Sequence, residues 1–127
     1  FSVNVKAPFF LTQTLLPTMN NPSQIITIGS MGGYQGSSKF AGLSLYSASK
    51  GAIAILTECM AEELKSQNIT INCMALGAVQ TEMLQQAFPG YKPPVTAAQM
   101  AVFIGNFALN NKGIINGKII PVALTTP

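Results

Sequence analysis

Residues 24–50 read QIITIGSMGGYQGSSKFAGLSLYSASK, and this stretch decides the fold. It opens with an isoleucine-rich run over 24–28, as expected for a buried strand. This run ends just before Gly29 and Ser30. A glycine-rich loop follows over 31–43, and a helix with an apolar stripe begins near Ser44. This order predicts a parallel α/β sheet whose chemistry lies at the carboxyl ends of its strands.

The flanking sequence extends this unit into a single domain over residues 1–127. The expected elements are a helix over 2–19, the helix over 44–66, a strand over 69–74, a short helix or flap over 81–88, a helix over 96–109 and a strand over 117–122. The helix over 96–109 starts with a capping box of Thr96 and Gln99. The fold class is therefore α/β, a partial parallel sheet with three strands and three main helices.

Two helices carry further signals. In the helix over 44–66 the apolar stripe comprises Ala48, Ala52, Ile55, Leu56, Cys59 and Leu64. Within 2–19, Pro8 lacks an N–H, so the carbonyl of Asn4 loses its helical partner. One interpretation is a kink, or a helix that begins near Pro8. The other is that the Asn4 carbonyl is freed to bind a water.

Composition excludes several classes of function. Charged residues make up 9% of the chain and the mean hydropathy is +0.36, which favours self-association. The net charge of +3 comes from scattered lysines without arginine, so we expect no nucleic-acid partner. The absence of histidine excludes His-based triads, and two cysteines are too few for a zinc site.

Cysteine usage and hydropathy bear on location. Cys59 and Cys73 form no paired-thiol motif, which is typical of a reduced, cytoplasmic protein. The longest nearly apolar run, over 97–109, is too short to span a membrane and is interrupted by Gln99 and Asn106. We therefore expect a cytoplasmic chain with no membrane partner.

Tyr46 and Lys50 are four residues apart in the expected helix, so both project from one face. A phenol is a poor base near neutrality, and a nearby ammonium favours its phenolate form. Ser30 could donate a hydrogen bond to a carbonyl and orient it toward Tyr46, while a water on the Asn4 carbonyl would link Lys50 to solvent. These residues predict a proton relay for interconversion of an alcohol and a carbonyl.

The loop over 31–43 invites comparison with phosphate-binding loops. Neither G-x-G-x-x-G nor G-x-x-x-x-G-K-[ST] fits its glycines, so a wall of the substrate pocket is the preferred interpretation. The flap over 81–88 would form another wall. Both segments carry few charges, which favours a small or apolar carbonyl or alcohol as substrate.

Four segments carry a resemblance to a known family: VNVKAPFFLTQ, IITIGS, YSASKGAI and NITINCMALGAVQTEM. Together they resemble the second half of a short-chain dehydrogenase/reductase (SDR). The resemblance implies the C-terminal half of a Rossmann-type doubly wound parallel sheet and an NAD(P)-dependent oxidoreductase. It implies an Asn–Ser–Tyr–Lys tetrad at Asn4, Ser30, Tyr46 and Lys50, with Tyr46 as the acid/base.

The resemblance also implies a cofactor, NAD or NADP, of which this chain contacts only the nicotinamide half. Its binding residues would be Tyr46, Lys50, Gly77, Val79 and Thr81. The glycine-rich segment that binds the adenosine half in this family is absent from the sequence, which starts at Phe1 inside a helical pattern. We therefore expect a fragment that binds cofactor weakly or not at all on its own.

The sequence departs from the family pattern at two further points. Ser30 and Tyr46 are farther apart than is usual, which we interpret as an insertion in the loop between them. Ser44 is consequently an alternative to Ser30. Leu76-Gly77 stands where the family usually has Pro-Gly after the second strand, and we expect this connection to be less rigid for that reason.

The resemblance implies a homodimer or homotetramer, because the corresponding helices of family members, here over 2–19 and 44–66, pack against a second subunit. An alternative function follows: a non-catalytic association module, or an inactive fragment, that self-associates through these helices and the open edge of the strand over 24–28. A globular α/β domain of unrelated function is the third possibility.

Overall fold

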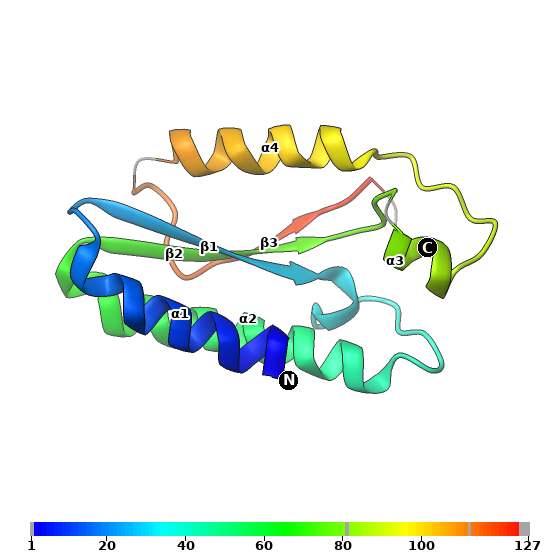
Figure 1. Ribbon diagram of the computed structural model, residues 1–127, viewed down its shortest axis with the longest axis horizontal. Helices are drawn as coiled ribbons and strands as arrows, with labels where there is room; N and C mark the ends of the chain where they lie inside the picture. Colours follow the sequence, from blue (N-terminus) through cyan, green and yellow to red (C-terminus); the bar gives the residue numbers. More distant parts are fainter. Residues whose placement is uncertain (1, 81, 112, 125–127) are drawn as a thin grey trace.

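The structure is a computed structural model that describes residues 2–80, 82–111 and 113–124. One sheet lies at its centre, made of the parallel strands β1 (Ser23–Ser30), β2 (Ile69–Leu76) and β3 (Ile119–Val122) in the order β1-β2-β3 (Figure 1). The predicted three-stranded parallel sheet and α/β class are confirmed. β2 is the buried central strand, as its nearly continuous apolar run indicates.

Helices cover both faces of the sheet. They are α1 (Ala7–Leu15), α2 (Ser44–Leu64), α3 (Glu82–Ala87) and α4 (Ala97–Asn110). α1 and α2 lie on one face of the sheet and α4 lies on the other, while α3 lies beyond the carboxyl ends of the strands (Figure 1). The core between α2 and the sheet is built on Met60, Ala61 and Ile71.

The helix predicted over 2–19 is divided at its proline. A π-helical segment, Ser2–Lys6, precedes α1, which begins at Ala7 with Pro8 in its first turn, and the 3₁₀ turn Leu16–Thr18 follows. Proline is tolerated in a first helical turn because its missing N–H would have no helical partner there. The expectation of a helix that begins near Pro8 is therefore confirmed.

The predicted boundaries of two other helices are confirmed by their caps. Thr96 Oγ1 accepts a hydrogen bond from the Gln99 N–H at 3.1 Å, and Gln99 Oε1 accepts one from the Thr96 N–H at 2.9 Å. This is the reciprocal capping box expected at the start of α4. After α2, Asn68 adopts a left-handed conformation with φ 58° and turns the chain into β2.

Only half of the apolar stripe predicted for α2 faces the core: Ala52 and Leu56 are half-buried and Leu64 is buried. Ile55 is 62% exposed, and Ala48 and Cys59 are also exposed. The buried residues of α2 are Ser49, Ile53, Thr57, Met60, Ala61 and Leu64. Polar Ser49 and Thr57 face the core because each is hydrogen-bonded there, so hydropathy alone predicts only part of the buried face.

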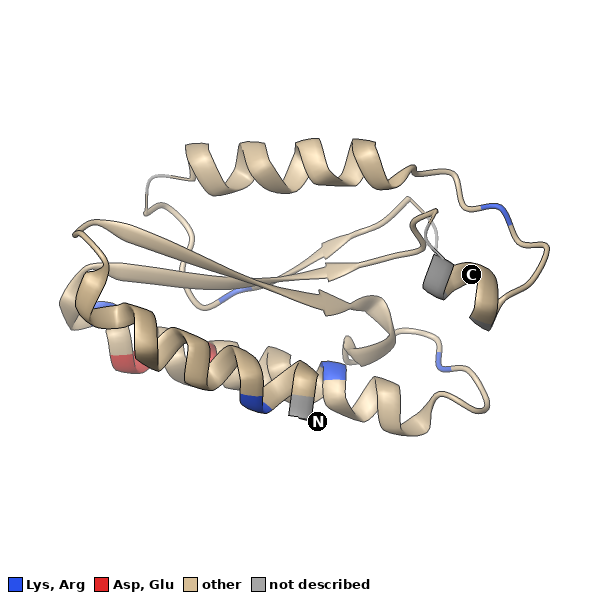
Figure 2. Ribbon diagram, in the orientation of Figure 1, with Lys and Arg blue, Asp and Glu red and all other residues tan. Residues whose placement is uncertain are grey.

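The surface is sparse in charge and rich in exposed apolar side chains. Figure 2 shows lysines spread over helices and loops, while the glutamates that it colours lie on α2. Large apolar side chains that are exposed include Phe10, Leu11 and Leu15 on α1, Leu45 and Ile55 on α2, and Val102, Phe103 and Leu109 on α4. Among the described helices, none combines the length and hydropathy needed to cross a membrane.

Candidate active site

The carboxyl end of β1 places Ser30 at the start of the loop, beside the first turn of α2. Ser30 Oγ accepts a hydrogen bond from the Gly32 N–H at 3.1 Å. A Cβ added to Gly32 would lie 3.4 Å from Ser30 Oγ and 3.8 Å from Tyr46 Cε2. The Ser30 hydroxyl and the Tyr46 ring therefore flank Gly32, which has no side chain to separate them.

Lys50 lies one helical turn beyond Tyr46, and the prediction that both share a face of α2 is confirmed. The Lys50 Nζ atom is 5.9 Å from the centroid of the Tyr46 ring. It donates a hydrogen bond of 3.3 Å to the carbonyl of Ile28, near the end of β1. The ammonium thus lies between the tyrosine and the end of the strand that carries Ser30.

Asn4 joins the site through its side chain. Asn4 Nδ2 donates to Ser49 Oγ at 2.9 Å, and the Ser49 hydroxyl donates to the Tyr46 carbonyl at 2.8 Å. Ser49 is 2% exposed, so this chain of hydrogen bonds is shielded from water. It fixes the π-helical segment to α2 at Tyr46. The role predicted for the Asn4 carbonyl stays a prediction.

Sequence reasoning missed two features of this region. One is Ser49 itself, whose signal was a small polar residue three positions after Tyr46 in a helix. The other is the contact of Gly33 with α2, where a Cβ on Gly33 would lie 2.4 Å from the backbone N of Gly51. The sequence signal for this contact is Gly51, directly after Lys50. Glycine destabilises a helix interior, so its presence inside α2 indicates a position where something packs closely.

The segment after β2 leaves the sheet at the same edge as Ser30, because Ser30 is paired in register with Leu76. The Gly77 N–H donates to the Val122 carbonyl at 2.9 Å, which anchors the connection to β3. Val79 is half-buried. Thr81, predicted to meet the cofactor, lies outside the described residues.

Ser44, the alternative serine, is the first residue of α2 and is exposed. Ser47, which the sequence did not single out, approaches the site more closely: its Oγ lies 3.3 Å from the Cβ position of Gly32. Three serines therefore surround the start of α2. Only Ser30 comes from a strand end, and it has a position set by the Gly32 N–H.

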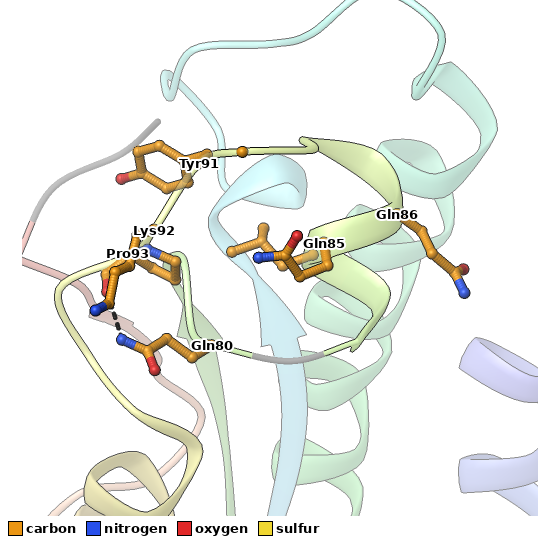
Figure 3. A pocket seen from close by; sticks show the side chains of 8 residues that line it. Gln80, Gln85, Gln86, Tyr91, Lys92 and Pro93 are labelled. Atoms are coloured by element: carbon orange, nitrogen blue, oxygen red, sulfur yellow. Dashed lines mark hydrogen bonds between the residues drawn. The ribbon is translucent and has the colours of Figure 1, made fainter.

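A cleft of about 690 Å³ opens beside α3, and both polar and apolar side chains form its wall. It is lined by Gln80, Leu84, Gln85, Gln86, Gly90, Tyr91, Lys92 and Pro93. Figure 3 shows the Gln85 side chain directed inward and the Gln86 side chain directed away. Gln80 Nε2 donates to the Pro93 carbonyl at 3.0 Å and closes the base of the cleft.

Comparison with known proteins gives a consistent result. A family model described as short chain dehydrogenase matches residues 1–92. The oxidoreductase YhxC of Bacillus subtilis is 34% identical over 88 residues, which cover 69% of this chain and 30% of that protein. An NADPH-dependent aldehyde reductase-like chloroplast protein of Arabidopsis thaliana is 30% identical over 138 aligned residues, covering 96% of this chain and 49% of that protein.

The solved structures that resemble this chain include members of the same family. A short-chain dehydrogenase/reductase from Serratia marcescens superposes with a TM-score of 0.78 at 31% identity, over 94% of this chain and 52% of that one. The chain spans about half, or less, of the length of these relatives. With a family match over most of its residues, the chain belongs to the short-chain dehydrogenase family.

Proposed function

We propose that this chain supplies the catalytic part of an NAD(P)-dependent oxidoreductase that interconverts an alcohol and a carbonyl. The observation that carries the proposal is the meeting of Ser30 and Tyr46 around Gly32, with the Lys50 ammonium 5.9 Å from the tyrosine ring. A hydroxyl that can orient a carbonyl, a phenol that can exchange a proton with it and a cation beside that phenol are what this reaction requires.

In the proposed mechanism Ser30 donates a hydrogen bond to the substrate oxygen, and Tyr46 transfers a proton to that oxygen or removes one from it. Lys50 stabilises the phenolate that forms when Tyr46 gives up its proton. Asn4 positions α2 through Ser49, and its carbonyl would hold the water that returns the proton to solvent. A bound nicotinamide would supply or accept the hydride.

The residues fit the nicotinamide half of that cofactor. Lys50 Nζ has three N–H donors, and its hydrogen bond to the Ile28 carbonyl leaves capacity for the hydroxyls of a ribose. Gly77, Val79 and Thr81 follow β2, whose end is in register with Ser30, and we propose that they meet the carboxamide. No G-x-G-x-x-G occurs in the sequence, so the adenosine half finds no matching loop.

The cleft beside α3 suggests the kind of substrate. Amide groups of Gln80 and Gln85 and the ammonium of Lys92 line it, with the Tyr91 ring at its side. Such a lining suits a small carbonyl or alcohol that carries a further hydrogen-bonding group.

The cofactor part of the proposal can be tested on the 127-residue chain with reduced nicotinamide mononucleotide, which lacks the adenosine half. We expect saturation-transfer NMR to show contact with its ribose and nicotinamide protons. Lys50→Met should weaken binding roughly tenfold or more, because a charge-assisted hydrogen bond contributes about 1.5–3 kcal/mol. The matched control is Lys65→Met, whose ammonium pairs with Glu62 on the surface.

Two results would contradict the proposal that this chain binds only the nicotinamide half of the cofactor, through Lys50. Equal weakening by Lys50→Met and Lys65→Met would remove Lys50 from the cofactor site. NADH or NADPH binding far more tightly than the mononucleotide would show that this chain holds the adenosine half as well.

A second candidate function is self-association, favoured by the exposed apolar side chains of α1 and α2. Leu45 is 77% exposed and Ile55 is 62% exposed, which leaves an apolar surface on α2 that a second copy would cover. Light scattering should then show a dimer or tetramer that Ile55→Lys dissociates. Val102→Lys on α4, where the side chain is 63% exposed, is the control, and equal dissociation by both variants would contradict an α2 interface.

A further inference from the structure

Phe40 and Phe88 connect two segments that are far apart in the sequence. Phe40 lies in the loop over 31–43, which joins Ser30 to α2, and Phe88 directly follows α3. Their ring centroids are 5.3 Å apart with an interplanar angle of 75°. This edge-to-face geometry is attractive beyond the apolar area it buries.

The loop presents Phe40 in a defined position. Lys39 Nζ donates to the carbonyls of Tyr34 and Ser37, both at 2.9 Å, and to Ser37 Oγ at 2.7 Å. The chain turns at Gly36 with φ 87°, a conformation that other residues rarely adopt. The loop is therefore folded around the Lys39 ammonium, next to Phe40 in the chain.

The chain segments that precede and follow the flap are joined to each other at its base. The Gln80 N–H donates to the Val95 carbonyl at 3.0 Å, and Gln80 Nε2 donates to the Pro93 carbonyl at the same distance. Along α3 the side chains of Gln85 and Gln86 are exposed, so they contribute little packing. The ring of Phe88 is thus a second point of attachment, at the other end of the flap.

We infer that the Phe40–Phe88 contact couples the loop to the flap and thereby sets how far the cleft beside α3 opens. A bulky ligand that displaces α3 must separate the two rings. Because the loop starts directly after Ser30 and leads into the first turn of α2, which carries Tyr46, the contact links the cleft to the catalytic groups. Phe40 is then a positioning residue that determines substrate size, a consequence that rests on the proposed function.

The coupling itself can be measured without cofactor or turnover, by hydrogen exchange of the 127-residue chain. Phe40→Ala should accelerate amide exchange over 82–91, across the contact, by roughly two- to tenfold. Phe88→Ala should do the same over 34–42. Phe40→Tyr keeps the ring and should retain the protection, and Phe103→Ala, which removes a ring that is 48% exposed on α4, is the control.

Exchange in β2 reports on global unfolding, and Phe40→Leu replaces Phe40→Ala if that strand loses protection. Acceleration confined to the mutated segment would overturn the coupling, as would equal acceleration by Phe103→Ala. A reciprocal effect in a chain without oxidoreductase activity would sustain the coupling while the proposed function fails. In an active enzyme, Phe40→Ala should lower KM for bulky substrates more than for small ones.

Discussion

The side-chain amide of Asn4 donates a 2.9 Å hydrogen bond to the hydroxyl of Ser49, which in turn donates to the Tyr46 carbonyl. This bond ties the segment that precedes α1 to the helix that carries the acid/base candidate. We expect Asn4→Ala to lower the free energy of unfolding by about 1–3 kcal/mol, because the buried Ser49 hydroxyl loses a donor.

A double-mutant cycle on chemical denaturation curves isolates this bond. Ser49→Ala should lower stability as well, and the double variant should be little worse than either single one, since both remove the same interaction. Additive losses would mean that Asn4 and Ser49 act independently.

Gly33 packs against the backbone of α2 at a distance that excludes any side chain. A Cβ there would lie 2.4 Å from Gly51 N and 2.5 Å from Lys50 C, so the loop must move away from α2 to accept it. We expect Gly33→Ala to cost about 2 kcal/mol or more in denaturant unfolding.

Gly105 provides the control, because it lies in α4 with open space around its Cβ position. Gly105→Ala should raise the free energy of unfolding by about 0.5–1 kcal/mol through helix propensity. Similar effects of the two substitutions would contradict the close packing of the loop on α2.

The thiol of Cys73 should make the free energy of unfolding depend on pH in the alkaline range. Burial raises the pKa of its thiol above the ordinary value of 9.0, and hydrogen bonding to Thr27 and the charge of Lys50 oppose that rise. Between the unfolded and folded pKa values only the folded state keeps the proton. The free energy of unfolding should therefore fall as the pH rises above about 9.

Comparing wild type with Cys73→Ala tests this effect. Urea unfolding from about pH 8 to about pH 10.5 should show a smaller loss of stability in the variant, which has no thiol to titrate. Parallel pH profiles would exclude a contribution from Cys73. Alkylation of the folded chain should meanwhile modify exposed Cys59 and spare buried Cys73.

Local sequence signals predicted the parts of the fold that depend on neighbouring residues. The capping box of Thr96 and Gln99 and the shared face of Tyr46 and Lys50 follow from spacing within one helix. The strand over 24–28 was predicted within the observed β1, because β-branched runs are characteristic of buried strands.

The features that the sequence did not predict depend on contacts between residues of different helices, strands and loops. The buried face of α2 was only partly predicted, because Ser49 and Thr57 bond to Asn4 and Thr27, each far away in the chain. The contact of Gly33 with Gly51 likewise exists only after the loop has packed on the helix. Hydropathy periodicity contains no information on such pairs.

The central claim is that Tyr46 exchanges a proton with the substrate. Turnover by a polypeptide that joins this chain to an adenosine-binding half, with NADH or NADPH and a panel of small ketones, tests it directly. Tyr46→Phe should lower kcat by about 10²–10⁴-fold, while Phe103→Leu, on α4 across the sheet from α2, should leave it unchanged. Turnover retained in Tyr46→Phe, or lost equally in both variants, would contradict the account.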